Sequence, residues 1–427
     1  MRASPPAAAN EQKSFASFLQ KRRFFLLFCK KEAKNFYLFD PQPAVKIGRA
    51  AAVPPFHVMD VIKAANARQK ALPPGAPHII HMEVGQPGTG APRDAAEAVA
   101  RALTDRQPMG YTEAFGLPGL RDRIAAHYQH WYGLTIPASR IAVTTGASGA
   151  FPLAFLAAFD PGDRIALAAP FYPPYVNILT ALGLHPEILH ATAETRFQPT
   201  PAMLARLDPP PQGLILASPC NPAGSMLHED EFAALAAWCT ANSVRLISDE
   251  IYHGLTYGEP LSTAAAIQGA IVINSFSKYF SMTGWRIGWM VLPEDLIRPV
   301  ECLTQNLFIS APHISQIAAH AAFDCHAELQ SNVDAYRRSR AHLLQALPQA
   351  GFTKLTPAEG AFYIYADVSD RTDDSAAFCA RLLDQAGIAA SPGIDFDRTR
   401  GHHFVRFSYC GPEADMREAA ERLHHFA

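Results

Sequence analysis

Short apolar runs alternate with helical patterns through the middle of the chain, and this alternation constrains the fold more than any other feature. Strands are expected at residues 141–145, 164–168, 213–217, 244–248, 270–274 and 287–292, and helices at 150–159 and 229–241. Strands separated by helices favour a mostly parallel sheet that is covered on both faces. The sequence therefore predicts a three-layer α/β/α domain, with ligands bound beyond the carboxyl ends of its strands.

The flanking segments have a different pattern, and a chain of 427 residues suits two domains. Further helices are expected at residues 59–70, 92–103, 117–132, 311–325 and 328–347, and strands at 78–84, near 360–366 and at 404–408. We predict a large domain at residues 96–309. A smaller α+β domain would combine an N-terminal part at 51–95 with a C-terminal part at 310–427.

Residues 1–50 contain more basic than acidic side chains and are predicted to be a poorly ordered extension. Their apolar run at 24–29 is shorter than the roughly 7 to 15 residues of a secretory signal core, and no small-residue cleavage site follows it. A wrongly chosen upstream start codon, an organelle-targeting arm and a basic arm that contacts phosphate are the alternatives.

The composition is typical of a soluble globular protein, with 49% hydrophobic residues and a formal charge of −2. This balance gives no indication of a nucleic-acid partner or a membrane surface, and no apolar run approaches the roughly 18 to 20 residues of a spanning helix. Seven cysteines lack metal-ligand spacing, and their odd number disfavours a disulfide framework. We therefore expect a cytoplasmic protein without a metal site.

Polar side chains follow four of the expected strands. They are Ser148, Asn221, Asp249 with Tyr252, and Lys278. Each also has an ordinary structural role available, such as helix capping for Ser148, a turn for Asn221 and packing for Tyr252. Because the carboxyl ends of parallel strands meet at one edge of a sheet, their joint occurrence favours a common site.

Lys278 lies in the segment 275–286, directly after the expected strand 270–274. Its neighbours include aromatic residues and Arg286, and a desolvated amine near another cation has a lowered pKa and becomes a nucleophile. An exposed lysine at a strand end is the structural alternative. Ser275 to Lys278 also match the Ser-x-x-Lys of penicillin-recognising acyl transferases, but the later Ser-Asp-Asn and Lys-Thr-Gly motifs are missing, which leaves a weak alternative.

Pyridoxal phosphate is a ligand that would use all of these groups. Lys278 would react with its aldehyde, and Asp249 would keep the ring nitrogen protonated, so that the ring can act as an electron sink. Tyr252 and Asn221 would bind the phenolic oxygen of the ring.

The phosphate of the same ligand would lie at the start of the helix that follows Gly146, Ala147 and Ser148. Arg286 would neutralise it with a forked donor, helped by the hydroxyls of Ser148 and Ser275.

The chain resembles the class I/II aminotransferases, the aspartate aminotransferase group of fold type I pyridoxal phosphate enzymes, from about His57 onward. The resemblance rests on motifs in the family's order: Gly85-Gln86-Pro87, Tyr111-Thr112, Gly116 to Arg121, Thr145 to Ser148, Pro170-Phe171-Tyr172, Asn221 to Gly224, Asp249 to Tyr252, Ser275 to Lys278, Met282 to Arg286, and Phe404 to Ser408.

The resemblance implies roles that the residues alone do not predict. Lys278 would form the imine with the cofactor and later move a proton at the substrate's Cα. Tyr172 would stack on the ring, and Ala147 would help to hold the phosphate. Arg406 would bind the substrate α-carboxylate, assisted by Asn221 and the Gly85 backbone. Tyr111 would reach the phosphate of a neighbouring subunit in a homodimer.

The implied activity is a ping-pong transfer of an amino group between an L-amino acid and a 2-oxo acid. A β-elimination lyase of the same fold is the alternative, and a transcription regulator that uses the fold as a sensor is a third hypothesis. Two departures from the family pattern stand out: Ala223 replaces a usual threonine, and Asp395-Phe396-Asp397 replaces a loop that often ends in glycine. An arginine for a second carboxylate is not identifiable, so dicarboxylate specificity stays open.

Overall fold

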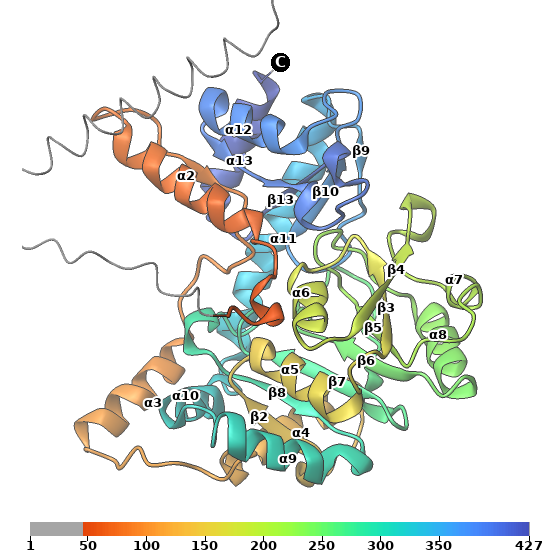
Figure 1. The fold of residues 1–427 in the computed structure, drawn as a ribbon. Helices are drawn as coiled ribbons and strands as arrows, with labels where there is room; N and C mark the ends of the chain where they lie inside the picture. Colours follow the sequence, from red (N-terminus) through yellow and green to blue (C-terminus); the bar gives the residue numbers. More distant parts are fainter. Residues whose placement is uncertain (1–45, 427) are drawn as a thin grey trace, which may run out of the picture. The chain divides into compact units, whose positions relative to one another are not determined.

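A seven-stranded sheet forms the centre of the larger part of the fold (Figure 1). The computed structural model describes residues 46–426, and residues from Arg49 onward form one compact unit. The predictions made for residues 1–45 lie outside the described residues.

The strands of this sheet are mostly parallel, as predicted. Their spatial order is β2 (Ile141–Thr144), β8 (Gly288–Val291), β7 (Ile271–Ser275), β6 (Arg245–Asp249), β5 (Gly213–Ala217), β3 (Arg164–Ala169) and β4 (His185–His190). Only β8 runs antiparallel to its neighbours in this sheet.

Both faces of the sheet are buried, because apolar side chains alternate between two cores. On β7, Ile271 and Ile273 pack with the core of α5 (Ala147–Ala158), α6 (Pro174–Ala181) and α9 (Glu294–Leu307). Val272, between them, packs into the opposite core. That core includes residues of α4 (Pro118–Tyr132), α8 (Glu229–Ala241), α10 (His313–Ala322) and α11 (His326–Gln349). The three-layer α/β/α prediction is therefore confirmed.

The chain also forms two smaller sheets, and α2 (His57–Ala71), α12 (Ser375–Ala386) and α13 (Glu413–His424) lie beside them (Figure 1). One has the order β12 (Ser391–Pro392), β13 (Phe404–Ser408), β10 (Tyr363–Asp367) and β9 (Lys354–Leu355), and the other pairs β1 (Ile80–His81) with β11 (Ile388–Ala389). The other helices are α3 (Arg93–Thr104) and α7 (Pro201–Leu204). No helix in the part of the chain that the structure describes is long and apolar enough to cross a membrane.

Several expected elements differ from the observed ones. The strand expected at 78–84 contains only β1, and the helix expected at 150–159 begins earlier, since α5 starts at Ala147. The sequence analysis missed α6 and β4. β4 is an edge strand of the sheet and contains His185, Glu187 and His190 among its six residues, so it lacks the continuous apolar run of a central strand.

Candidate active site

A cavity of about 450 Å³ lies where the central strands end. The register aligns Ala217 of β5 with Asp249 of β6, and Asp249 with Ile273 of β7, so the loops after these strands meet at one edge. Ten of the residues predicted from the sequence line this cavity: Gly85, Ala147, Ser148, Tyr172, Asn221, Asp249, Tyr252, Lys278, Arg286 and Arg406. The predicted convergence at a sheet edge is thus observed.

The amine of Lys278 is enclosed in the turn after β7. Its Nζ donates a hydrogen bond to the carbonyl oxygen of Gly85, and it lies 5.6 Å from the ring centre of Tyr252 and 5.7 Å from that of Phe362. Burial lowers the pKa of Lys278 to about 8, and the cations of Arg406 and Arg286 act in the same direction. Roughly a tenth of such amines are neutral at pH 7, which makes Lys278 a competent nucleophile.

Asp249 is a buried carboxylate at the end of β6. Its Oδ1 accepts the backbone N–H of Ile251 at 3.1 Å, and its Oδ2 accepts the hydroxyl of Tyr175. Burial raises the pKa of Asp249 to about 6. Among the described residues, no basic side chain pairs with Asp249 within 4.0 Å. A cationic group in the cavity would therefore find its counter-charge here.

An anion site lies at the start of α5. The guanidinium of Arg286 contacts the hydroxyl of Ser148, with 3.4 Å between Nη2 and Oγ. Gly146 has a φ of 77°, and a Cβ built on it would lie 2.6 Å from Arg286 Nη2, so glycine is required for this close approach. The first N–H groups of a helix have no partner within the helix, and with Arg286 they favour a phosphate.

Arg406 on β13 is 2% exposed and has no carboxylate partner among the described residues. Its Nη1 donates to Asn221 Oδ1 at 2.7 Å, and its Nη2 donates to Ser391 Oγ at 3.1 Å and to the Glu83 carbonyl. Its Nε has no hydrogen-bond partner. A buried guanidinium that lines a cavity and has no carboxylate partner among the described residues suits a ligand carboxylate.

Two predicted residues do not line the cavity. The hydroxyl of Ser275 is directed to Ser277 Oγ at 2.9 Å and to the Ile287 carbonyl at 3.0 Å, and Ser277 lines the cavity instead. This geometry argues against the acyl-transfer alternative, because a nucleophilic serine must reach its substrate. Tyr111 is 83% exposed.

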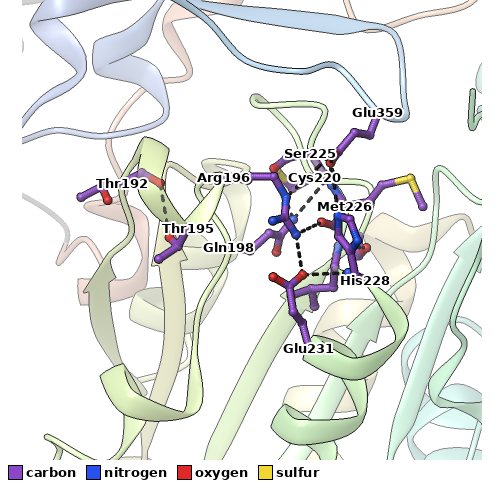
Figure 2. A network of polar contacts seen from close by, with 12 residues as sticks. Thr192, Thr195, Arg196, Gln198, Cys220, Ser225, Met226, His228, Glu231 and Glu359 are labelled. Atoms are coloured by element: carbon purple, nitrogen blue, oxygen red, sulfur yellow. Dashed lines mark hydrogen bonds and ion pairs between the residues drawn. The ribbon is translucent and has the colours of Figure 1, made fainter. Parts of the chain in front are cut away.

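A network of polar contacts supports the turn that presents Asn221 (Figure 2). Gln198 Nε2 donates to the carbonyl oxygens of Ala217 at 3.2 Å and Ser225 at 3.1 Å, on the two sides of this turn. Nearby, Arg196 pairs with Glu231 and contacts the Met226 carbonyl. The turn that the sequence predicts at Asn221 is therefore fixed by residues from other segments.

The sequence analysis missed several residues of the cavity. Tyr175 holds Asp249, and Tyr363 hydrogen-bonds Tyr252 with 2.7 Å between the hydroxyls. A third group, at the start of α2, consists of Phe56, Val58, Met59 and Ile62. For Tyr175 a weak signal existed, since it lies only three residues after Tyr172, whereas only the tertiary fold brings Tyr363 and α2 to the cavity.

Comparison with known proteins agrees with this geometry. The family model for aminotransferase class I and II matches residues 77–423. A valine–pyruvate aminotransferase from Mycobacterium tuberculosis is 49% identical over 88% of this chain and 97% of its own length. An aspartate/prephenate aminotransferase from Thermus thermophilus is 32% identical over 84% of this chain and 94% of its own length.

Solved structures agree as well. An aminotransferase from Mycobacterium tuberculosis superposes with a TM-score of 0.86 at 49% identity, and covers 90% of this chain and 99% of that one. A putative aminotransferase from Silicibacter pomeroyi gives a TM-score of 0.84 at 52% identity with the same coverage. The chain thus belongs to the class I and II aminotransferases, fold type I enzymes that transfer an amino group between an amino acid and a 2-oxo acid.

Proposed function

We propose that this aminotransferase uses pyridoxal phosphate, attached covalently to Lys278. The observation that supports this most strongly is that one cavity is lined by the Lys278 amine, the carboxylate of Asp249 and the guanidinium of Arg286, and that neither of the last two groups has an oppositely charged partner among the described residues. A phosphorylated pyridine aldehyde would match all three, with its phosphate at Ser148 and Arg286 and its ring nitrogen at Asp249. When bound, its ring supplies the sink for the electrons released at the substrate's Cα.

The remaining cavity residues would orient this group and the substrate. Tyr252 and Asn221 would hydrogen-bond the phenolic oxygen, and Tyr172 would cover the ring. Ala147 would add backbone N–H contacts, and Ser275 would act on the phosphate through Ser277, because its own hydroxyl does not reach the cavity.

Arg406 would bind the substrate α-carboxylate through the Nη donors that contact Asn221 and Ser391. The backbone of Gly85 would border the same subsite. Lys278, whose pKa is lowered to about 8, would remove the proton from Cα of the amino donor. It would deliver a proton to the corresponding carbon of the 2-oxo acid when that acid becomes the product amino acid. Asp249 would hold the positive ring nitrogen throughout.

We further propose that the amino donor has an apolar side chain, with valine and pyruvate as the pair to test first. The cavity wall formed by α2 is wholly apolar, and the relative with 49% identity is named a valine–pyruvate aminotransferase. The alternative β-elimination reaction would use the same cofactor residues, and the relatives compared above are named for amino transfer.

The experiment is a reaction of purified protein, reconstituted with pyridoxal phosphate, with valine and pyruvate. Formation of alanine and 2-oxoisovalerate at equal rates is expected, without ammonia. Borohydride should reduce a yellow chromophore onto Lys278, as mapped by mass spectrometry. Absence of the chromophore would refute the cofactor proposal. Release of ammonia and pyruvate from cystathionine without amino transfer would instead support elimination.

The enzyme is further proposed to be a homodimer in which Tyr111 contributes to the partner's site. Tyr111 is highly exposed, and so are Leu307, Phe308 and Ile309. The loop of Tyr111 is held near this segment, because the N–H of Thr112 donates to Ser310 Oγ at 3.3 Å. Mixing inactive Lys278→Ala subunits with Tyr111→Ala subunits should create one complete site per hybrid dimer. Activity above both parents is expected, and its absence would contradict sharing of Tyr111.

We also propose that the protein is cytoplasmic, and that the large domain spans residues 96–309 with the smaller domain on both sides of it in the sequence. All cysteines in the described part of the chain are free, which suits a reducing compartment.

A further inference from the structure

The first turn of α2 is held by a carboxylate from a distant part of the chain. Its N-cap residue, Phe56, makes no side-chain capping bond. Instead, Asp395 Oδ1 accepts the N–H of His57 at 3.0 Å, and Asp395 Oδ2 accepts the N–H of Val58 at 2.9 Å. Asp395 is 6% exposed, and a carboxylate that binds two helix N–H groups also complements the helix dipole.

The turn that Asp395 holds forms one wall of the active-site cavity. Phe56, Val58, Met59 and Ile62 all line it, and none of them can form an ion pair or a side-chain hydrogen bond with a substrate. The ring of Phe56 meets that of Tyr172 edge to face, with 6.2 Å between the ring centres. The position of this wall therefore determines how much apolar substrate surface the cavity can bury.

The residue after Asp395 contacts the other end of the substrate site. The ring of Phe396 lies 4.7 Å from the guanidinium carbon of Arg406, and its carbonyl accepts the N–H of Phe171 at 3.0 Å. Phe396 is fully buried. Two adjacent residues thus connect the α2 wall with the arginine assigned to the substrate carboxylate, which fixes the distance between the two subsites.

We propose that Asp395 is a positioning residue that sets the preference for branched apolar amino donors by holding the α2 wall against the cavity. This inference rests on the proposed function. Valine buries more apolar surface against the wall than alanine, whose side chain is a single methyl group, so loss of the wall should affect valine more. A purely structural role of Asp395 would affect both donors alike.

The test uses holoenzyme and single-turnover loss of the cofactor's absorbance with valine or alanine, so that no acceptor is needed. In Asp395→Ala, the ratio of the second-order rate constants for valine over alanine should fall roughly tenfold, a size typical of a lost helix cap, and mainly through weaker apparent binding of valine. Asp395→Asn keeps one acceptor oxygen, so the valine-to-alanine ratio should fall by about half as much as in Asp395→Ala on a logarithmic scale.

Asp397→Ala is the matched control. Asp397 is also buried in the same loop, but its carboxylate binds the N–H groups of Thr399 and Arg400 and the Arg400 side chain, without contact to α2. It should leave the valine-to-alanine ratio unchanged.

Three outcomes would overturn the role of Asp395 while leaving the aminotransferase activity intact. They are an unchanged ratio in folded Asp395→Ala, an equal loss for both donors, and the same fall in Asp397→Ala. If Asp395→Ala does not fold, the ratio in Asp395→Asn decides in the same way. A wild-type holoenzyme that turns over neither donor would refute the proposed substrate class itself, which is a distinct result.

Discussion

The hydroxyl of Tyr175 donates a hydrogen bond to the carboxylate of Asp249, and both groups are buried beside the active-site cavity. Burial raises the pKa of Asp249, whereas this hydrogen bond favours the ionised form and lowers it. Tyr175 therefore keeps a carboxylate charged in a position where burial alone would neutralise it. A charged Asp249 is the form that can stabilise a cationic ring nitrogen.

Tyr175→Phe should weaken the binding of pyridoxal phosphate by about tenfold or more, since a hydrogen bond to a charged group contributes roughly 1.5–3 kcal/mol. The acid limb of kcat/KM should also move to higher pH, because Asp249 becomes harder to ionise. Cofactor titration and pH profiles measure both effects. Tyr365→Phe is the control, because the Tyr365 hydroxyl is buried without a partner. Equal affinity in Tyr175→Phe and wild type would contradict this role.

Lys278→Ala should lower transamination by a factor of at least about 10⁴, because it removes both the covalent attachment and the group that moves the Cα proton. Steady-state assays with valine and pyruvate measure this loss. Lys354→Ala removes an exposed lysine that pairs with Asp370 at 2.9 Å, and should leave the rate unchanged. Ser275→Ala should keep most of the activity. Near-complete loss of transamination in Ser275→Ala, with transamination retained in Lys278→Ala, would contradict the role of Lys278.

Glu250 should make stability depend on pH. Burial raises its pKa from 4.5 to about 7, so the folded state retains a proton that the unfolded state releases between these values. The free energy of unfolding should therefore decrease as pH rises through this window, by on the order of 3 kcal/mol in total, and level off above it. Glu250→Gln should remove most of this decrease in urea unfolding measured from pH 4.5 to 8.

Asp249 titrates in an overlapping range, so a smaller decrease with pH should persist in Glu250→Gln. Glu97→Gln is the matched control, since Glu97 is exposed and pairs only with Arg101 across one helical turn. An identical pH dependence in wild type and Glu250→Gln would show that Glu250 is ionised in the folded protein.

The central layer of the fold could be predicted because its physical signal is local. Continuous apolar runs such as 270–273 specify strands buried on both faces, and the helical repeat at 229–241 gives α8 with the expected bounds. Polar residues directly after these runs must lie at the carboxyl edge, so Asp249 and Lys278 could be assigned to one site. Edge strand β4 could not be found, since His185, Glu187 and His190 interrupt the apolar pattern.

The part of the site formed by distant segments was not predictable in this way. Tyr363 and the α2 wall are brought to the cavity by the tertiary arrangement of distant segments, and a strand tyrosine or an apolar helix residue is otherwise typical of a core. Asp395 illustrates the same limit. The sequence marked its loop as a departure from the family pattern, but only the structure reveals that its carboxylate binds α2.

Arg406→Lys should raise KM for the amino acid and for the 2-oxo acid by about 10- to 100-fold, because lysine keeps the charge but loses the planar fork that binds a carboxylate at two points. It also loses stacking on Tyr363, whose ring centre is 4.4 Å from the guanidinium carbon. Steady-state kinetics with both substrates measure this change.

Arg400→Lys is the control, because Arg400 binds Asp397 and backbone carbonyls outside the cavity. A primary amine without a carboxylate should react equally slowly with wild type and Arg406→Lys. If Arg406 binds the carboxylate, removing its planar fork must raise KM. An unchanged KM for valine in Arg406→Lys would therefore exclude Arg406 as the carboxylate site.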